Sequence, residues 1–512
     1  MKILDCTLRD GGYYTNWDFD KLLVEQYLKA MEALPVDYVE LGYRNNQLSG
    51  YYGEYYYLPD FVLKFCKDCC PTTKLAVMLN VKDTEITDLN KLLISCKQHI
   101  SLIRLATAPT DVEKAIELSK QIKKMGFEVG LNIMYMSKWL NIDGFFDKIE
   151  KTNNLVDYLW LVDSFGGVFP DEIKKIIAEV RKKTNAKLGF HGHNNLEMAF
   201  FNSITAVENG CDIVDATITG MGRGAGNLKT ELLLSYLSKT DKNIDLNELT
   251  SVVSIFESLR KEYEWGTNMP YMISGVNSLP QKDIMEFMSK KRYSVSNIVR
   301  TLQRDTNQNS TRFSLLKTIQ KENDILIIGG GDTIQNHILA IQKFIKQSEH
   351  LSIVFSSAKH LELFDFTKKL NNERFFCLVG DEGVRIEKKL DFVQDNDVFV
   401  LPLFSQKMNV YVPEKIKKQA FEMAENQIDC VLYGDSPLLL GLEIALQTTT
   451  NDTTVFLVGF DGYTDNFRAA DKYDLMTENQ EVINKFVQQK ELKSLTPTKY
   501  SNLSEISIYS FL

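Results

Sequence analysis

Eight short apolar runs alternate with amphipathic stretches between Lys2 and Tyr236 of this 512-residue chain. Each run has the length and residue types of a buried strand, and the stretches between the runs repeat apolar residues at helical spacing. Strands that alternate with helices build parallel sheets, and eight such units in about 240 residues predict a single TIM barrel. The expected strands are Ile3–Thr7, Tyr38–Leu41, Leu75–Leu79, Leu102–Ala106, Glu128–Ile133, Tyr158–Val162, Lys187–Phe190 and Ile213–Thr217.

The rest of the chain predicts two further parts. Residues 241–320 look helical and end in a polar linker, whereas residues 321–512 again alternate strands with helices. We therefore expect an α/β protein with a TIM (β/α)8 barrel at 1–240, a helical extension and linker at 241–320, and an open parallel-sheet, Rossmann-like α/β domain at 321–512.

Polar residues end or follow the expected strands of the barrel, and Arg104 lies within the fourth strand. Because the C-terminal ends of the strands meet at one face of a TIM barrel, these side chains should gather there. Core packing alone does not explain such a collection. The residues are Arg9, Asp10, Glu40, Tyr43, Arg44, Asn80, Arg104, Asn132, Asp163, Ser164, His191, His193, Thr217 and Thr219.

Three stretches within this set predict a divalent-metal site. They are Asp5–Gly12, His191–Asn195 and the glycine-rich Gly220–Asn227. One carboxylate from Asp10 and two imidazoles from His191 and His193 suit a hard-to-borderline cation. Residues two apart in a strand point to the same side, so both imidazoles can face the barrel mouth. Two hydrogen-bonded core histidines and a helix-capping aspartate are the alternative interpretation.

These stretches resemble the signatures of the DRE-TIM metallolyase superfamily, which includes isopropylmalate synthases, hydroxymethylglutaryl-CoA lyases and 4-hydroxy-2-oxovalerate aldolases. The resemblance covers about residues 1–300 and is greatest to the 4-hydroxy-2-oxovalerate aldolase-like proteins. It implies Mg²⁺, Mn²⁺, Co²⁺ or Zn²⁺ held by Asp10, His191 and His193, with Asn227 as a weak ligand or a neighbour of the ligands. It also implies a homo-oligomer, and that Arg9 stabilises a developing enolate oxygen.

The chemistry of such a site favours a metal-dependent aldolase or lyase that acts on a 2-oxo acid and an aldehyde. A 2-oxo acid can chelate the metal through its carboxylate and keto oxygens, and the metal then stabilises the enolate as a Lewis acid. Arg9 adds a fixed positive charge at the same oxygen. The substrate is expected to be of the 4-hydroxy-2-oxo acid type, and the additional domain suggests a carbohydrate-derived aldehyde. The predicted substrate-binding residues are Arg104, Asn132, Tyr14 and Thr217.

One residue departs from the aldolase pattern. In the aldolases that the chain resembles, a histidine follows the Arg-Asp-Gly-x run and serves as the base toward the substrate's hydroxyl, and here Tyr13 stands at that position. A tyrosine with a pKa of about 10 is a poor base unless a cation lowers that pKa. Tyr13 is therefore either the acid/base residue or a residue that positions the substrate.

Two other functions remain open for the barrel. One is an acyl-CoA-dependent Claisen condensation of the isopropylmalate synthase type. The other is a binding or regulatory role without catalysis, which the missing histidine supports and the complete set of metal ligands opposes.

The second α/β pattern contains one motif that suggests a ligand. Gly329–Gly331 follows an apolar run and resembles a phosphate-cradling turn, although it does not match Gly-x-Gly-x-x-Gly. A nucleotide or sugar-phosphate ligand and a role in assembly are both compatible with it, as is a simple tight turn.

Composition narrows the classes of partner. The net charge of −9 argues against a nucleic-acid-binding protein. No apolar run approaches the roughly 20 residues of a membrane-spanning helix, and the first residues lack the pattern of a secretory signal. We therefore expect a cytoplasmic protein that binds neither nucleic acid nor membrane. The eight cysteines lack the spacing of a zinc site and are expected to be reduced thiols.

Overall fold

The computed structural model describes the chain except for residues 241–243, 291, 304–312, 318–319, 365–371, 404–409, 431–433 and 464–474. The chain divides into two compact units, Met1–Glu286 and Phe287–Leu512. Most of the predicted linker between helices and second domain lies outside the described residues. No helix within the described parts has both the length and the apolar character needed to cross a membrane. All eight cysteines are free thiols.

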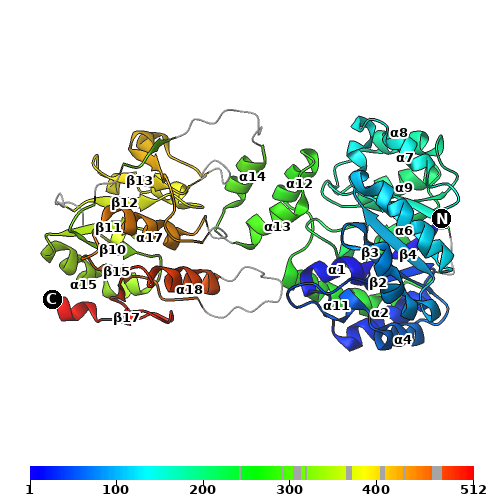
Figure 1. The fold of residues 1–512 in the computed structure, drawn as a ribbon, viewed down its shortest axis with the longest axis horizontal. Coiled ribbons are helices and arrows are strands. Elements are labelled where there is room, and N and C mark those ends of the chain that lie inside the picture. The colour runs from blue at the N-terminus through cyan, green and yellow to red at the C-terminus, as the bar shows by residue number, and fades with distance from the viewer. Residues whose placement is uncertain are drawn as a thin grey trace. The chain divides into compact units, whose positions relative to one another are not determined.

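The first unit contains the predicted barrel. Eight parallel strands pair in sequence order, and β1 closes the barrel against β8, with helices packed around them (Figure 1). The strands are β1 (Lys2–Asp5), β2 (Tyr38–Tyr43), β3 (Lys74–Asn80), β4 (Leu102–Thr107), β5 (Glu128–Ile133), β6 (Tyr158–Asp163), β7 (Lys187–Gly192) and β8 (Ile213–Ala216). Each predicted strand overlaps an observed one, which confirms the TIM-barrel fold.

Twelve described helices accompany these strands in the first unit or end just beyond it. They are α2 (Lys21–Ala33), α3 (Glu54–Tyr57), α4 (Asp60–Cys69), α5 (Leu89–Leu93), α6 (Val112–Lys124), α7 (Phe145–Glu150), α8 (Pro170–Arg181), α9 (Ala199–Glu208), α10 (Thr230–Leu237), α11 (Asn247–Tyr263), α12 (Met269–Val276) and α13 (Gln281–Ser289). α11 packs against α2, so part of the helical segment after the barrel belongs to the barrel's own core.

One further helix, α1 (Thr7–Thr15), carries the Arg-Asp-Gly motif. The predicted strand continued to Thr7, but β1 ends at Asp5 because the Asp5 carboxylate turns the chain into α1. It accepts hydrogen bonds from the Thr7 amide at 2.9 Å and from the Thr7 hydroxyl at 2.6 Å. Helical spacing then places Arg9 and Tyr13 on one face of α1, while Tyr14 lies to the side of that face.

The interior of the barrel is filled around Trp160. A Cβ on Gly130 or on Gly189 would lie 2.6 Å or 2.5 Å from the Trp160 ring, so both glycines are needed to admit the indole. Trp160 stacks against the Arg104 guanidinium at 4.1 Å. The Trp160 ring therefore fills the barrel interior and packs against the Arg104 guanidinium.

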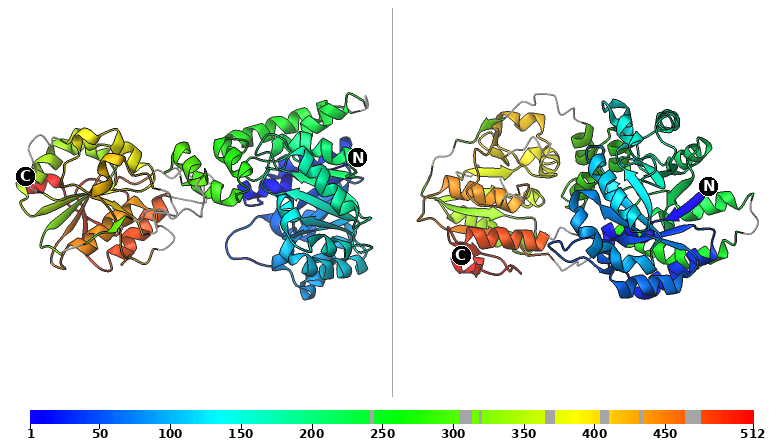
Figure 2. Two further views of the ribbon diagram at one scale, coloured as in Figure 1. Left: turned by 90° about the horizontal axis from the view of Figure 1, so that it is seen from above. Right: turned by 45° about the vertical axis from the view of Figure 1, so that its right-hand side comes forward.

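The second unit is an open sheet, as predicted. Among the described residues its nine strands are all parallel, in the order β17-β16-β15-β10-β11-β12-β13-β14-β9, with helices on both faces (Figure 2). The strands are β9 (Ser314–Leu315), β10 (Asp324–Ile328), β11 (Leu351–Phe355), β12 (Arg374–Cys377), β13 (Val398–Leu401), β14 (Ala420–Glu422), β15 (Val455–Val458), β16 (Leu492–Ser494) and β17 (Ser504–Glu505).

Helices of the second unit lie in two separate cores. α15 (Thr333–Gln347) packs into one of them, and α17 (Pro437–Thr448) and α18 (Leu475–Phe486) pack into the other. The remaining described helices are α14 (Val295–Gln303) and α16 (Glu382–Glu387). Because α15 follows β10 on one face and α18 follows β15 on the other, the connections after these neighbouring strands lead to opposite faces of the sheet. Ligands bind at such a switch point in open α/β sheets.

Candidate active site

A cavity of about 640 Å³ opens at the C-terminal ends of the barrel strands. The structure brings six of the ten predicted site residues into its wall: Arg9, Asp10, Tyr13, Asn132, His191 and His193. A seventh, Asn227, is buried directly behind the wall, where its Nδ2 donates a hydrogen bond of 2.7 Å to Asp10 Oδ2. Residues from α1, β5, β7 and the glycine-rich loop therefore converge as the barrel rule requires.

Backbone pairing holds the histidine and glycine-rich motifs together. His193 forms an isolated antiparallel bridge with Asn227, and the Asn194 amide donates to the Gly226 carbonyl at 2.8 Å. Gly226 has φ +75°, and a Cβ there would lie 2.2 Å from the Gly220 carbonyl oxygen, so only glycine permits this close loop. The loop thereby fixes Asn227 against Asp10.

Both imidazoles are oriented through their Nδ1 atoms. His191 Nδ1 lies 2.8 Å from Asp215 Oδ2, and His193 Nδ1 lies 2.8 Å from the Asp163 carbonyl oxygen. These acceptors assign the proton to Nδ1 in each ring and leave the lone pair on Nε2. His191 Nε2 is 3.6 Å from Asp10 Oδ2. The His191 nitrogen suited to binding a cation thus faces the Asp10 carboxylate.

The charge states also suit a cation. Burial lowers the pKa of His193 to about 3, with the neighbouring His191 as a further cause, so its ring is neutral. Burial alone would raise the pKa of Asp10, but Arg9 and the histidines outweigh it and lower that pKa to about 2. Asn227 Oδ1 is buried without a hydrogen-bond partner among the described residues. One anionic oxygen, neutral imidazole nitrogen and one unpartnered amide oxygen fit a divalent metal.

The low pKa of His193 predicts an acid-sensitive barrel in metal-free buffer. Between about pH 3 and the ordinary histidine pKa near 6.5, the unfolded chain binds a proton that the folded chain does not, so stability falls as the pH falls. From pH 7 to pH 5, wild type should lose about 2 kcal/mol of unfolding free energy relative to His193→Asn, at about 1.4 kcal/mol per pH unit. Urea titrations at several pH values measure this, and parallel curves for the two proteins would contradict it.

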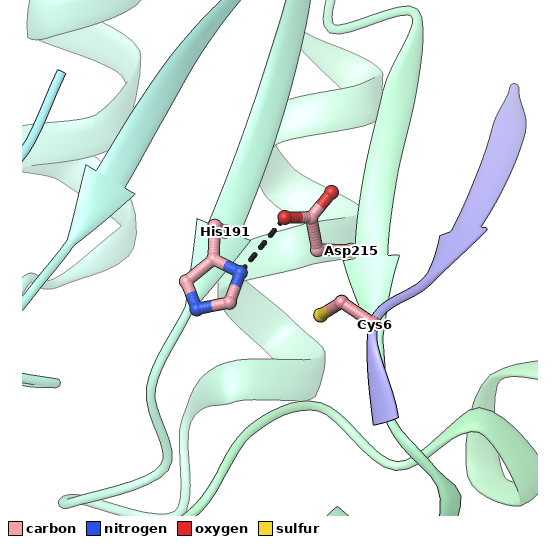
Figure 3. A group of neighbouring side chains, drawn as sticks. All are labelled: Cys6, His191 and Asp215. Carbon is pink, nitrogen blue, oxygen red and sulfur yellow. Dashed lines mark hydrogen bonds and ion pairs between the residues drawn. The ribbon is translucent and has the colours of Figure 1, made fainter. Parts of the chain in front are cut away.

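Cys6, His191 and Asp215 form a second group of neighbouring metal-ligand atoms, all within 4.8 Å of one another (Figure 3). The figure shows the His191 ring hydrogen-bonded to Asp215, with the Cys6 sulfur beside them. Burial raises the pKa of the Cys6 thiol well above its usual range, which disfavours the thiolate that a metal needs. Asp215 is already bonded to Arg104 and to Trp160 Nε1. We therefore infer that Cys6 and Asp215 lie behind His191 and orient it, and that they are not the metal ligands.

Arg104 links Asp215 to Arg9 through hydrogen bonds to shared carboxylates. Its Nη1 donates to Glu40 at 3.0 Å, its Nη2 to Asp215 at 2.5 Å and its Nε to Asn132 at 3.1 Å. Glu40 also accepts a 2.7 Å bond from Arg9, which is paired with Asp10. A buried series of alternating charges therefore connects Asp10 to His191, in the order Asp10, Arg9, Glu40, Arg104, Asp215 and His191.

Three predicted substrate-binding residues lie outside the cavity wall. Arg104 has 0% exposure and its guanidinium is engaged by its neighbours, so the prediction of direct substrate contact is corrected to a positioning role. The Tyr14 hydroxyl accepts a bond from the Gly224 amide, and its ring packs on Trp265. Thr217 is buried, and its backbone pairs with Leu228 and Thr230. For Tyr14, helical rather than extended spacing turned the side chain away.

Tyr13 belongs to a polar aromatic group in the wall. Its hydroxyl shares a 2.9 Å hydrogen bond with the Tyr43 hydroxyl, and the Arg223 guanidinium lies 4.1 Å from its ring centroid. Burial raises the pKa of Tyr43 well above its usual range. The sequence placed Tyr43 at a strand end, but its pattern assigned no role to Tyr43 or to Arg223, which lies within the glycine-rich stretch Gly220–Asn227. It also missed Asp215, whose signal was a charged residue inside the apolar β8.

The second unit has its own cavity, of about 450 Å³, at the switch point between β10 and β15. Gly329–Gly331 lines it, followed by the start of α15. Asp461 occupies the helix N-terminus, because its carboxylate accepts a 3.0 Å bond from the Thr333 amide and a second bond from the Thr333 hydroxyl. The chain's own carboxylate therefore fills the position that a phosphate takes in a phosphate-binding turn.

The chain is similar in sequence to known aldolases. It is 26% identical over 271 residues to the 4-hydroxy-2-oxovalerate aldolase of Thermomicrobium roseum, covering 53% of this chain and 74% of that protein. It is 28% identical over 258 residues to the enzyme of the same name from Carboxydothermus hydrogenoformans, covering 49% and 75%. The sequence model of the HMGL-like family matches residues 84–256, a region that contains His191, His193 and Asn227.

A solved structure matches more strongly. It is the crystal structure of the N-terminal domain of a proposed aldolase from Bacteroides vulgatus, with 51% sequence identity and a TM-score of 0.56. The match covers 59% of this chain and 99% of that one.

Proposed function

Because the chain belongs to the HMGL-like family of the DRE-TIM metallolyase superfamily and is a lyase of the aldolase type, we propose that it forms or cleaves a carbon–carbon bond beside the keto group of a 2-oxo acid. The reaction partners are an aldehyde and, as the joined product, a 4-hydroxy-2-oxo acid. The observation that carries the proposal is the convergence of Asp10, two oriented imidazoles and Arg9 on one cavity.

Asp10, His191 and His193 would hold a divalent ion, with Asn227 Oδ1 as a further donor. Mg²⁺, Mn²⁺, Co²⁺ and Zn²⁺ are all compatible with these ligands. Such an ion, when bound, polarises the keto group of the 2-oxo acid and makes the protons on C3 more acidic.

Arg9 supports the same oxygen from the protein side. Its Nε donates to Glu40 and its Nη1 to Asp10, and among the described residues its Nη2 has no hydrogen-bond partner. Two anchored nitrogens fix the guanidinium plane, so the positive charge is in place before charge develops on the enolate oxygen. Such preorganised donors stabilise a transition state without reorganisation.

Tyr13 is the proposed acid/base residue toward the aldehyde oxygen. In bond formation its hydroxyl donates a proton to that oxygen, and in cleavage it takes the proton back from the C4 hydroxyl. The Tyr43 hydroxyl shares a hydrogen bond with the Tyr13 hydroxyl, and the Arg223 guanidinium lies over the Tyr13 ring, so both residues hold Tyr13 in place at the cavity wall.

Tyr13→Phe should therefore lower the rate of aldol cleavage by about 10²–10⁴-fold, the usual contribution of a general acid or base. Tyr43→Phe should have a smaller effect, because it removes only a hydrogen-bond partner. Tyr14→Phe is the matched control, since Tyr14 lies outside the cavity wall. Equal rates for Tyr13→Phe and Tyr14→Phe would assign the proton transfer to another group.

Deuterium uptake at C3 of pyruvate and 2-oxobutyrate in D₂O, followed by NMR, tests the proposed function without knowledge of the aldehyde. Exchange should require Mg²⁺, Mn²⁺ or Co²⁺ and should stop on addition of a chelator. If metal binds but exchange is absent, and acetyl-CoA is condensed with a 2-oxo acid instead, the acyl-CoA reaction is the correct one. If neither reaction occurs, the barrel is a binding protein.

We further propose that the second unit binds a nucleotide or sugar phosphate in its 450 Å³ cavity. Because Asp461 occupies the N-terminus of α15, the phosphate would lie at Lys359 and Arg385, two half-exposed cations in the cavity wall. The hydroxyl groups would contact the carboxylates of Asp332 and Asp381 in the same wall.

A panel of nucleoside monophosphates and sugar phosphates tests this second proposal by thermal unfolding. A ligand present at about 100 times its Kd should stabilise the unit by about 2.7 kcal/mol. The shift should shrink in Arg385→Met and persist in Lys174→Met, which removes an exposed lysine from α8. If no compound changes the unfolding temperature, a role in assembly is the better interpretation.

A further inference from the structure

The barrel cavity is larger than its expected donor substrate. A volume of about 640 Å³ would hold roughly 20 water molecules at ~30 Å³ each, whereas pyruvate has only about six non-hydrogen atoms. The 2-oxo acid belongs beside Asp10, His191 and His193. The remaining wall, which includes Tyr13, Arg223 and Gln281, is therefore available to the aldehyde.

Arg223 contributes a positive charge without an anion of its own. Its guanidinium lies over the Tyr13 ring at 4.1 Å and is half-buried, and within the described structure it makes no hydrogen bond or ion pair. The nearby Asp10 carboxylate is already bonded to Arg9 and Asn227. A partly buried arginine is normally paired, so this one presents unused donors to the cavity.

Gln281 packs against the loop that carries Arg223. It is the first residue of α13, it is 6% exposed, and its Nε2 donates to Asn195 Oδ1 at 3.0 Å. Its Oε1 is buried against the backbone of Gly224, since a Cβ on Gly224 would be 2.1 Å from it. Gln281 therefore helps to hold Arg223 in the cavity wall.

We infer that Arg223 forms a subsite for an anionic aldehyde, which is the second substrate of the proposed aldolase. Arg223 binds a carboxylate or phosphate of the aldehyde through paired N–H donors. The other charged residues of the cavity wall do not favour an anionic aldehyde, because the two lysines Lys82 and Lys282 are balanced by Asp111 and Asp283. This inference rests on the proposed function.

The test compares kcat/KM for matched aldehydes with pyruvate as donor. Glyceraldehyde 3-phosphate is compared with glyceraldehyde, and succinic semialdehyde with butyraldehyde, so the two pairs separate phosphate from carboxylate recognition. Wild type should prefer the anionic member of one pair by about 100-fold, and Arg223→Met should reduce that preference to about threefold or less. Arg223→Lys keeps the charge without the paired donors and should fall between them. Lys174→Met controls for the change in net charge.

Two results would overturn the inference. The first is an equal preference for charged and uncharged aldehydes in wild type. The second concerns the KM of Arg223→Met for pyruvate, measured by C3 deuterium exchange without aldehyde. If this KM rises as much as the KM for the anionic aldehyde, Arg223 binds the donor and not the aldehyde. Absence of exchange in wild type would instead contradict the proposed function.

Discussion

Asp10→Asn should leave the barrel folded but unable to retain a stoichiometric divalent ion. Asparagine keeps the size of the side chain and can still bond to Asn227, but it lacks the negative charge. In wild type the Asp10 carboxyl has a pKa of about 2 and is therefore ionised throughout the physiological range. Replacing an outer partner of a metal site typically costs about 10–100-fold in affinity or activity, so loss of a charged ligand should exceed 100-fold. Metal content by mass spectrometry and C3 deuterium exchange measure the two effects.

Two further variants decide between the two candidate ligand groups. Asp215→Asn replaces the carboxylate that orients His191 and pairs with Arg104 but leaves Asp10 and both imidazoles in place, so exchange should fall by about 10–100-fold while some metal is retained. Cys6→Ser should have little effect on metal content. If Asp10→Asn keeps its metal while Cys6→Ser loses it, the ion is held by Cys6, His191 and Asp215, and our assignment of the ligands is wrong.

Arg104→Met should have the largest effect on stability. Arg104 is fully buried between Glu40 and Asp215, and removal of one partner from a buried ionic network typically costs about 3–5 kcal/mol because it leaves carboxylates unpaired in the interior. Glu40 would retain Arg9, so most of the loss should arise at Asp215. Methionine keeps much of the side-chain volume, which limits the contribution of an empty space.

Tryptophan fluorescence during denaturation measures this loss in the whole chain. All four tryptophans, Trp17, Trp139, Trp160 and Trp265, belong to the first unit, so the signal reports the barrel alone. Lys174→Met is the control, and it should change stability by less than about 1 kcal/mol because it breaks only an exposed ion pair. Addition of Asp215→Asn to Arg104→Met should recover part of the loss. A loss below 1 kcal/mol in Arg104→Met would mean that the network does not stabilise the barrel.

Asp10, His191 and His193 could be proposed as a group without a structure, because strand ends of a parallel barrel share a face and residues two apart in a strand share a side. The sequence did not show that Asp10 lies in the helix α1. The structure places Thr217, directly after β8, and Tyr14, on α1, outside the cavity wall. At Tyr14 the chain had already turned into α1 under the influence of Asp5. Local patterns locate a strand better than they locate its last residue.

Arg104 shows a different limit. Its place within β4 was predicted, but which partner its guanidinium would meet depends on Glu40 from β2, Asp215 from β8 and Asn132 from β5. These residues are distant in sequence and come together only because the sheet closes. A single charged residue in a strand therefore indicates that a buried partner exists, without indicating whether that partner is substrate or protein.

The amino-acid pattern alone determined the eight-stranded barrel, the second parallel sheet and the residues expected to hold a metal, because burial and strand periodicity act over a few residues at a time. The tertiary structure alone decided which nitrogen of each histidine is hydrogen-bonded within the protein, which charges balance one another, and that Gln281, from beyond the barrel strands, lies against Gly224. These features depend on contacts between residues that are distant along the chain. Only the folded chain brings such groups within hydrogen-bond distance, where the low dielectric of the interior makes their pairing decisive.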